Sequence, residues 1–175
     1  DPMRRGYRSS TGGSTGEPLY FWCDRSAGPL RRANTLRGYR WTGFDIGDRQ
    51  AVLWGVNLDR PLRERVTGSL KHYFNNILFL SSFEMDPGSM RGYASGLRRW
   101  KPHLVIGYPS ALTVFSEFCE REGVRLHRPM AVVTSGEMLF PHQRETVERV
   151  FEAPVFNRYG SREFSNVAQE CEKHE

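Results

Sequence analysis

The ten residues HLVIGYPSAL, at positions 103–112, indicate the fold class of this chain. The apolar run 103–108 predicts a short β-strand without polar alternation, and helical spacing of apolar residues over 110–122 follows it directly. A strand that is apolar on both sides is typical of a sheet whose two faces are both covered. The stretch therefore predicts one strand–helix unit of a parallel sheet.

The same unit recurs along the chain. Further strands are expected at 19–23, 49–55, 76–83, 130–136 and 154–160, the first of them as a buried strand. Helices are expected at 28–43, 61–74, 86–100 and 141–151. This alternation predicts an α/β fold, a mainly parallel sheet with helices on both faces. Right-handed crossovers would place the carboxyl ends of the strands at one edge, where open sheets bind ligands.

Composition sets bounds on the partners. The 175 residues and 38% hydrophobic content suit a globular domain, and the net charge of +5 comes from arginines spread along the chain. This spread does not indicate a nucleic-acid face. Three cysteines offer no disulfide framework, and no apolar run is long enough to cross a bilayer. We expect a cytoplasmic protein with neither nucleic acid nor membrane as a partner.

Residues 9–18, SSTGGSTGEP, form a stretch rich in hydroxyl groups and glycine. Such a stretch is often a flexible linker. Glycines also allow backbone N–H groups to turn toward an anion, and hydroxyls add donors, which is phosphate-binding chemistry. Glu17 and Pro18 follow Gly16, so the stretch is not a Walker loop.

Three further motifs fall at the expected ligand edge of the sheet. They are GYPSAL at 107–112, TSGEML at 134–139 and NRYGSREF at 157–164. By itself TSGE is compatible with a strand-to-helix turn that carries a cap. Tyr159 is compatible with stacking on a flat ring or with packing in the core. Glu163 is compatible with a magnesium ligand beside phosphates or with a surface ion pair to Arg158 or Arg162.

In this order, the four motifs resemble those of the adenylate-forming superfamily of acyl-CoA ligases, luciferases and peptide-synthetase adenylation domains. The residues of these motifs are most similar to those of the branch of phenylacetate–CoA ligase-like proteins, which includes proteins named for capsular polysaccharide biosynthesis. The resemblance implies that residues 1–175 are the central part of an ATP-binding large domain. It also implies that the family's N-terminal portion and small C-terminal domain are absent from this chain.

The resemblance also implies roles for individual residues. The loop for the ATP phosphates is Ser10, Thr11, Gly12, Gly13, Ser14, Thr15 and Gly16. The residues around adenine are Ser135, Gly136, Glu137, Asn157, Tyr159 and Gly160. The residues near the acyl group are Ser82, Phe83, Gly107, Tyr108 and Pro109. The magnesium ligand is Glu163, and the catalytic residues are Glu163, Thr15 and Arg162.

The implied activity is the ATP-dependent activation of a small carboxylic acid as an acyl-adenylate, with Mg²⁺, followed by transfer to coenzyme A. Two alternatives stay open: transfer of AMP to a hydroxyl of a coenzyme or glycan, and a non-catalytic module that binds nucleotide or a partner. The chain departs from the family at Leu19, where many members have Lys, and at Arg162, where many have Thr. Arg162 could bind the α-phosphate or the substrate, or point away.

Two further expectations concern the surface and the C-terminus. Sheet edges without neighbours would need a partner chain or self-association, so a homo-oligomer is one expectation. Cys171 and His174 form a C-x-x-H pair, which is half of a zinc site or an ordinary surface pair.

Overall fold

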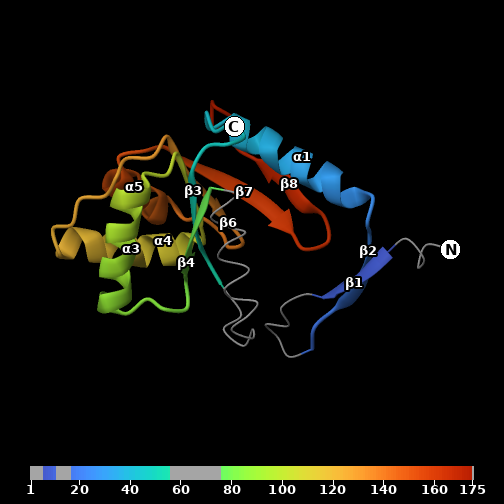
Figure 1. Ribbon diagram of the computed structural model, residues 1–175, viewed down its shortest axis with the longest axis horizontal. Coiled ribbons are helices and arrows are strands. Elements are labelled where there is room, and N and C mark those ends of the chain that lie inside the picture. Colours follow the sequence, from blue (N-terminus) through green and yellow to red (C-terminus); the bar gives the residue numbers. More distant parts are fainter. Residues whose placement is uncertain (1–5, 11–16, 56–75, 175) are drawn as a thin grey trace.

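The computed structural model describes residues 6–10, 17–55 and 76–174 (Figure 1). Its main sheet has six strands in the spatial order β4 (Ile77–Ser81), β3 (Gln50–Trp54), β5 (Leu104–Gly107), β6 (Ala131–Ser135), β7 (Val155–Ser161) and β8 (Ser165–Gln169). All neighbours pair in parallel except β7 and β8, which are antiparallel. The predicted α/β fold with a mainly parallel sheet is confirmed.

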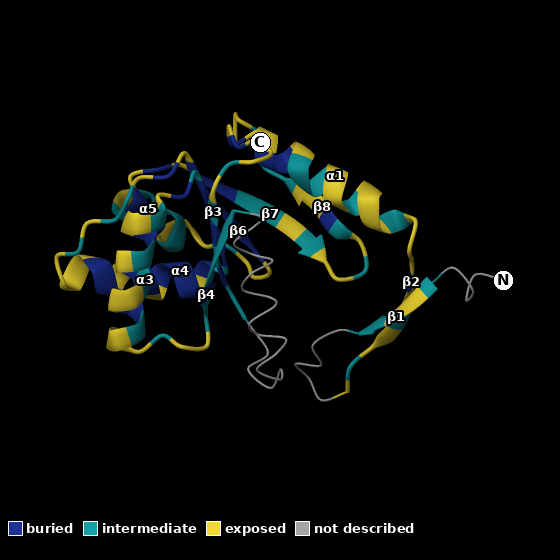
Figure 2. Cartoon of the chain, viewed as in Figure 1, coloured by how far each residue is buried: buried dark blue, intermediate teal, exposed yellow. Residues whose placement is uncertain are grey.

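Helices cover both faces of this sheet. α3 (Pro87–Trp100), α4 (Pro109–Arg121) and α5 (Pro141–Phe151) lie on one face, and α1 (Ala27–Arg40) lies on the other (Figure 1). The core follows the same division, because Val105 packs with the three helices whereas Leu104 and Ile106 pack on the side of α1. The central strands are thus buried on both sides (Figure 2), which explains their lack of polar alternation.

Local sequence sets where the helices begin. Asp86 caps α3, since its Oδ1 accepts hydrogen bonds from the backbone N–H groups of Gly88 (2.9 Å) and Ser89 (3.1 Å). Pro109 and Pro141 occupy the first position of α4 and α5, where proline costs no helical hydrogen bond. Each helix therefore starts at a defined residue soon after a strand.

The amino-terminal strand differs from its prediction. Among the described strands, β2 (Tyr20–Asp24) pairs only with β1 (Gly6–Ser10), in an antiparallel ribbon separate from the main sheet. Cys23 is buried in β2, but Tyr20 and Trp22 are 55% and 57% exposed. The prediction of a buried strand was wrong because one face of the ribbon has no layer packed over it within the described residues.

The helix expected at 61–74 and most of the phosphate loop, 11–16, lie outside the described residues. No helix in the described part of the chain has the length and hydropathy needed to cross a membrane.

Candidate functional site

A cavity of about 400 Å³ lies at the carboxyl edge of the parallel strands. Its lining comes from four strands and from the turn between β7 and β8, and consists of Trp54, Tyr108, Ser135, Gly136, Arg158, Gly160, Ser161, Arg162, Ser165 and Asn166. This is the edge at which open α/β sheets bind ligands.

The alternation of the strands explains why these side chains meet. On the side of α1, the core takes one residue from each of four strands: Val52, Ile106, Val133 and Phe156. Two positions further along come Trp54, Tyr108, Ser135 and Arg158. Residues two apart in a strand share a face, so the cavity lies on the same face of the sheet as α1, beyond the core residues of that face.

Aromatic rings and a glycine form one side of the cavity. The rings of Trp54 and Tyr108 are stacked with their centroids 3.9 Å apart and their planes at 25°. Gly136 has φ +88°, and a Cβ atom built there would lie 2.8 Å from Cε1 of Tyr108. Only glycine accommodates both this backbone conformation and the contact with the ring. Burial raises the pKa of Tyr108 above its ordinary value.

Among the described residues, the charged ones that line this cavity are Arg158 and Arg162, and none of them is a carboxylate. Arg162 lies in the turn between β7 and β8, and its Nη1 donates a hydrogen bond to the Ser10 carbonyl at 2.7 Å. Ser10 ends β1, directly before positions 11–16. The cavity therefore carries positive charge and suits an anion.

Helix α1 holds the turn that carries Arg162 and Glu163. Nη2 of Arg31 donates to the Glu163 carbonyl at 2.6 Å, and Nδ2 of Asn34 donates to the Asn166 carbonyl at 2.7 Å. Gly160 lies at an irregularity in the β7–β8 pairing, and a Cβ atom there would clash with the Ser165 carbonyl. The conformation of this turn thus depends on a glycine and on two polar contacts from α1.

Glu163, the predicted magnesium ligand, lies in the turn between β7 and β8 and is not among the described residues that line the cavity. Its own backbone N–H and the Ser161 hydroxyl lower the pKa of Glu163, so the side chain is ionised at neutral pH. The described residues contain no group of three or more His, Cys, Asp or Glu side chains that could hold a metal. Magnesium commonly takes only one or two protein carboxylates together with substrate phosphate oxygens, so a lone Glu163 fits that mode of binding.

A second hollow of about 420 Å³ adjoins the first. It is lined by Ser82, Phe83, Met85, Tyr108, Ser110, Ala111, Val114 and Glu137. Three of the residues expected near an acyl group, Ser82, Phe83 and Tyr108, therefore lie together, and Tyr108 lines both hollows. Glu137 connects two of the motifs, because its Oε2 accepts a hydrogen bond from the Ser110 backbone N–H at 3.0 Å.

Gly107 and Pro109 are buried beside this hollow. A Cβ atom at Gly107 would lie 2.9 Å from Cγ of Leu112 and 3.1 Å from the Leu53 carbonyl oxygen. Gly107 thus allows α4 to pack closely against β3 and β5.

Some predicted residues lie outside both hollows. The backbone N–H of Asn157 donates to Oε2 of Glu170 at 2.8 Å, and Oγ1 of Thr134 lies 3.5 Å from Oδ1 of Asn157. Tyr159 is 69% exposed. Neither side chain is among the lining that brings Ser135, Gly136 and Gly160 together. The residues Thr11, Gly12, Gly13, Ser14, Thr15 and Gly16 lie outside the described part of the chain.

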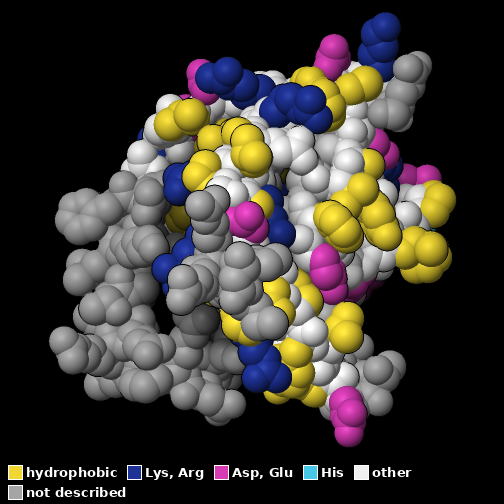
Figure 3. Space-filling model, turned by 90° about the vertical axis from the view of Figure 1, so that its right-hand side faces the viewer, with side chains coloured by type: hydrophobic (Ala, Val, Ile, Leu, Met, Phe, Trp, Pro, Cys, Tyr) yellow, Lys and Arg dark blue, Asp and Glu magenta, His cyan; other side chains and the backbone are white. Residues whose placement is uncertain are grey.

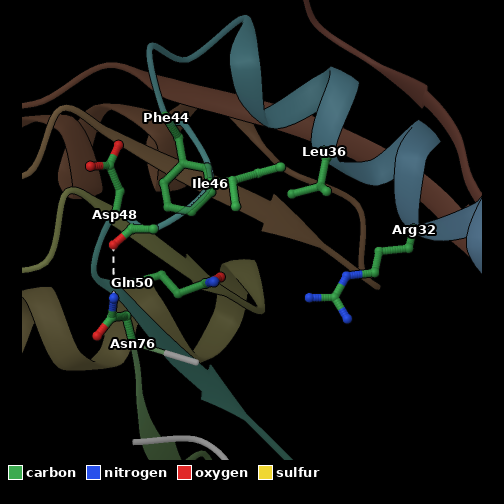
Figure 4. A pocket seen from close by; sticks show the side chains of 8 residues that line it. Arg32, Leu36, Phe44, Ile46, Asp48, Gln50 and Asn76 are labelled. Carbon is green, nitrogen blue, oxygen red and sulfur yellow. Dashed lines mark hydrogen bonds between the residues drawn. The ribbon is translucent and has the colours of Figure 1, made fainter. Parts of the chain in front are cut away.

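A smaller hollow of about 260 Å³ lies at the opposite edge of the sheet (Figure 4). It includes Gln50, which begins β3, and Asn76, whose side-chain amide donates to the Gly47 carbonyl at 2.8 Å. Arg32 and Leu36 of α1 approach it from the side. Because it lies at the amino ends of the strands, we do not assign the chemistry to it.

At the C-terminus, the ring of His174 stacks on Phe156 with centroids 4.6 Å apart, and its Nδ1 lies 3.5 Å from Oε2 of Glu170. Cys171 and His174 do not belong to any cluster of metal-ligating side chains among the described residues. We therefore propose no zinc site at Cys171 and His174.

The motifs did not point to Trp54, Arg158 or Asn166 as lining residues. Arg158 lies two positions after Phe156 in β7 and so shares its face, but the sequence alone does not show that this is the face on which the cavity lies. The strand pairing and the core packing show it.

No family model matches this sequence. The chain is 26% identical to protein CapK of Staphylococcus aureus over 172 residues, an alignment that covers 89% of this chain and 35% of CapK. Among solved structures, it superposes on 2-hydroxyisobutyryl-CoA ligase in complex with 2-HIB-AMP and CoA with a TM-score of 0.71 and 20% identity. A malonyl-CoA ligase and the luciferase-like enzyme of the mealworm Zophobas morio match with TM-scores of 0.58 and 0.59, at 18% and 15% identity.

These likenesses confirm, at the level of the fold, the predicted resemblance to adenylate-forming enzymes. The match covers 99% of this chain but 37% of the 2-hydroxyisobutyryl-CoA ligase chain, and 95% against 35% for the malonyl-CoA ligase. The chain therefore spans between a third and two fifths of the length of these proteins.

Proposed function

We propose that this chain forms the nucleotide-binding part of a ligase that uses ATP to activate a carboxylic acid as its acyl-adenylate and then transfers the acyl group to coenzyme A. The observation that carries the proposal is the cavity at the carboxyl edge of the sheet. Its described lining includes two arginines and no carboxylate, a glycine backbone and two aromatic rings form one side, and a second hollow adjoins it. An adenylate needs these two neighbouring sites, one for the nucleotide and one for the acid.

The chemistry follows from this placement. The carboxylate oxygen of the acid attacks the α-phosphorus of ATP, a new P–O bond forms, and the bond to the β-phosphate breaks as pyrophosphate leaves. Holding both reactants in adjoining hollows removes much of the entropic barrier of a two-substrate step. Arg162, which also contacts the end of β1, would stabilise charge on the phosphates. Glu163 would hold Mg²⁺, which neutralises phosphate charge when bound.

The comparisons support this proposal without naming the substrate. One structural neighbour was solved with an acyl-adenylate and CoA, and another with methylmalonyl-CoA and AMP. The likeness to CapK is in keeping with the phenylacetate–CoA ligase-like branch. We extend the proposal to an aryl or acyl acid as substrate and to the cytoplasm as location, whereas the homo-oligomer stays a prediction.

The test is ATP–pyrophosphate exchange by the full-length protein with a panel of aryl and fatty acids. Exchange that depends on one class of acid would support acyl-adenylate formation and identify that class. A lack of exchange with every acid, in a protein that binds ATP, would contradict the proposal. In that case, analysis of which acceptor carries AMP would separate transfer to a hydroxyl from a non-catalytic module.

A further inference from the structure

Arg158 has no carboxylate partner among the described residues, unlike several other arginines of the chain. Arg144 lies 2.6 Å from Oε1 of Glu170, Arg149 lies 2.6 Å from Oε1 of Glu120, and Arg91 lies 2.6 Å from Oε2 of Glu122. No ion pair with a described residue is found for Arg158, although its side chain is half-buried in the cavity. Partly desolvated charges are usually paired, so this guanidinium points to an anion that comes from outside the chain.

The orientation of Arg158 is fixed by α1. Its Nη1 donates a hydrogen bond of 2.7 Å to the hydroxyl oxygen of Tyr39, and its guanidinium carbon lies 5.6 Å from the centre of the Tyr39 ring. Tyr39 is itself buried and packs edge-on against Phe44, with centroids 5.9 Å apart. This bond engages one N–H of the five in the fork, which leaves donors for a ligand.

Register places this guanidinium next to the backbone expected to lie against adenine. Arg158 pairs with Ser135 in the β6–β7 ladder, and Gly136 follows Ser135. Arg162, the second cation of the cavity, lies in the turn that follows β7. A ligand that rests on Gly136 therefore shares the cavity with two arginines, which suits a phosphoryl group because guanidinium N–H donors match its oxygens.

We propose that Arg158 binds a phosphoryl oxygen of the nucleotide and that Tyr39 positions it. This inference rests on the proposed function, and it adds a ligand-binding residue and a positioning residue that the motifs did not indicate. Lysine cannot replace this arginine fully, because an ammonium group lacks the planar fork that bonds Tyr39 and a phosphate together.

The experiment compares the binding of AMP, adenosine and inorganic pyrophosphate to the full-length protein by calorimetry. Charge-assisted hydrogen bonds predict that Arg158→Gln weakens AMP binding by about 10- to 100-fold, and that adenosine binding is unchanged. Arg158→Lys should recover part of the affinity. Arg99→Gln, which removes the same charge from the exposed surface of α3, is the matched control and should bind AMP as the unaltered protein does.

Tyr39→Phe separates positioning from packing, since the ring remains and only the hydroxyl is lost. We expect AMP affinity to fall by about 2- to 10-fold, and to fall no further when Tyr39→Phe is added to Arg158→Gln. Two results would contradict the positioning role: an equal loss of adenosine binding in Tyr39→Phe, or a further loss of AMP affinity when Tyr39→Phe is added to Arg158→Gln.

The outcomes distinguish this inference from the function on which it rests. AMP binding that is unaltered in Arg158→Gln, with ATP bound by the parent protein, would overturn the role of Arg158 and leave the proposed function in place. If pyrophosphate binding depends on Arg158 and neither AMP nor ATP binds, Arg158 forms an anion site but the proposal that its ligand is a nucleotide is overturned. Failure to bind any of the probes would overturn both. If Arg158→Gln does not fold, Arg158→Lys and Tyr39→Phe carry the comparison.

Discussion

Substituting Gly136 by alanine tests whether the backbone beside the two aromatic rings is as constrained as the structure indicates. At φ +88° an L-residue pays a backbone cost of roughly 1–2 kcal/mol. The added methyl group would also lie 2.8 Å from the Tyr108 ring and 3.4 Å from Trp54, so the stacked pair must move. Losing an aromatic pair costs about 0.5–1.5 kcal/mol. We therefore expect Gly136→Ala to lower the free energy of unfolding by about 2–3 kcal/mol.

The matched control is Gly47→Ala. Gly47 has φ +100°, but a methyl group there would meet nothing within 4 Å, so this variant pays the backbone cost alone. Chemical denaturation of both variants measures the difference, and thermal unfolding should show it as a larger shift, at about 2–4 °C per kcal/mol for a chain of this size. If Gly136→Ala is no less stable than Gly47→Ala, the close contact between Gly136 and the rings is refuted.

Three further predictions concern single carboxylates and one ring. Glu163→Ala should suppress pyrophosphate exchange by orders of magnitude without a change in thermal stability, and an active, folded variant would exclude its role at the phosphates. Tyr159→Ala should weaken ATP binding if the exposed ring stacks on adenine, a role that unchanged affinity in calorimetry would rule out. Burial alone would raise the pKa of Glu170, but hydrogen bonds from Arg144 and the Asn157 backbone lower it. The stability that ionised Glu170 provides is therefore present above about pH 4.3 and is lost as the pH falls below that value, so Glu170→Gln should flatten the acid limb of the unfolding free energy; a limb as steep as that of the parent protein would argue against this.

The central strands could be predicted from sequence because their apolar runs are buried on both faces. β8 was missed for the converse reason: its residues, SNVAQ, are mostly polar, as suits a strand with one neighbour at the edge of the sheet. β2 was predicted as buried from its aromatic residues, and nothing in the local sequence shows that it pairs with β1 away from the core. Figure 3 views the side on which this ribbon lies in Figure 1, and hydrophobic side chains stand exposed there among Lys and Arg.

The candidate site was predictable in part. The motifs brought Ser135, Gly136 and Arg162 to the carboxyl edge of the sheet, and the structure places all three in the lining of one cavity, because parallel strands end at the same edge. They did not separate the two faces of β7, so Tyr159 was expected beside Ser135 whereas Arg158 is the residue that lines the cavity. Which face is open depends on the pairing of β6 with β7 and on the position of α1, and both are properties of the whole sheet.

The ring of Tyr108 belongs to the lining of both hollows, and Glu137 ties the segment after β6 to the start of α4. A ligand that shifts this ring from one side changes the space on the other, so the two occupants are expected to influence each other's affinity. Such coupling is reciprocal: the factor by which AMP alters the binding of an acid equals the factor by which the acid alters the binding of AMP. The acid preference of the protein should therefore be measured with nucleotide bound, because a nucleotide that shifts the Tyr108 ring would change the space available to the acid.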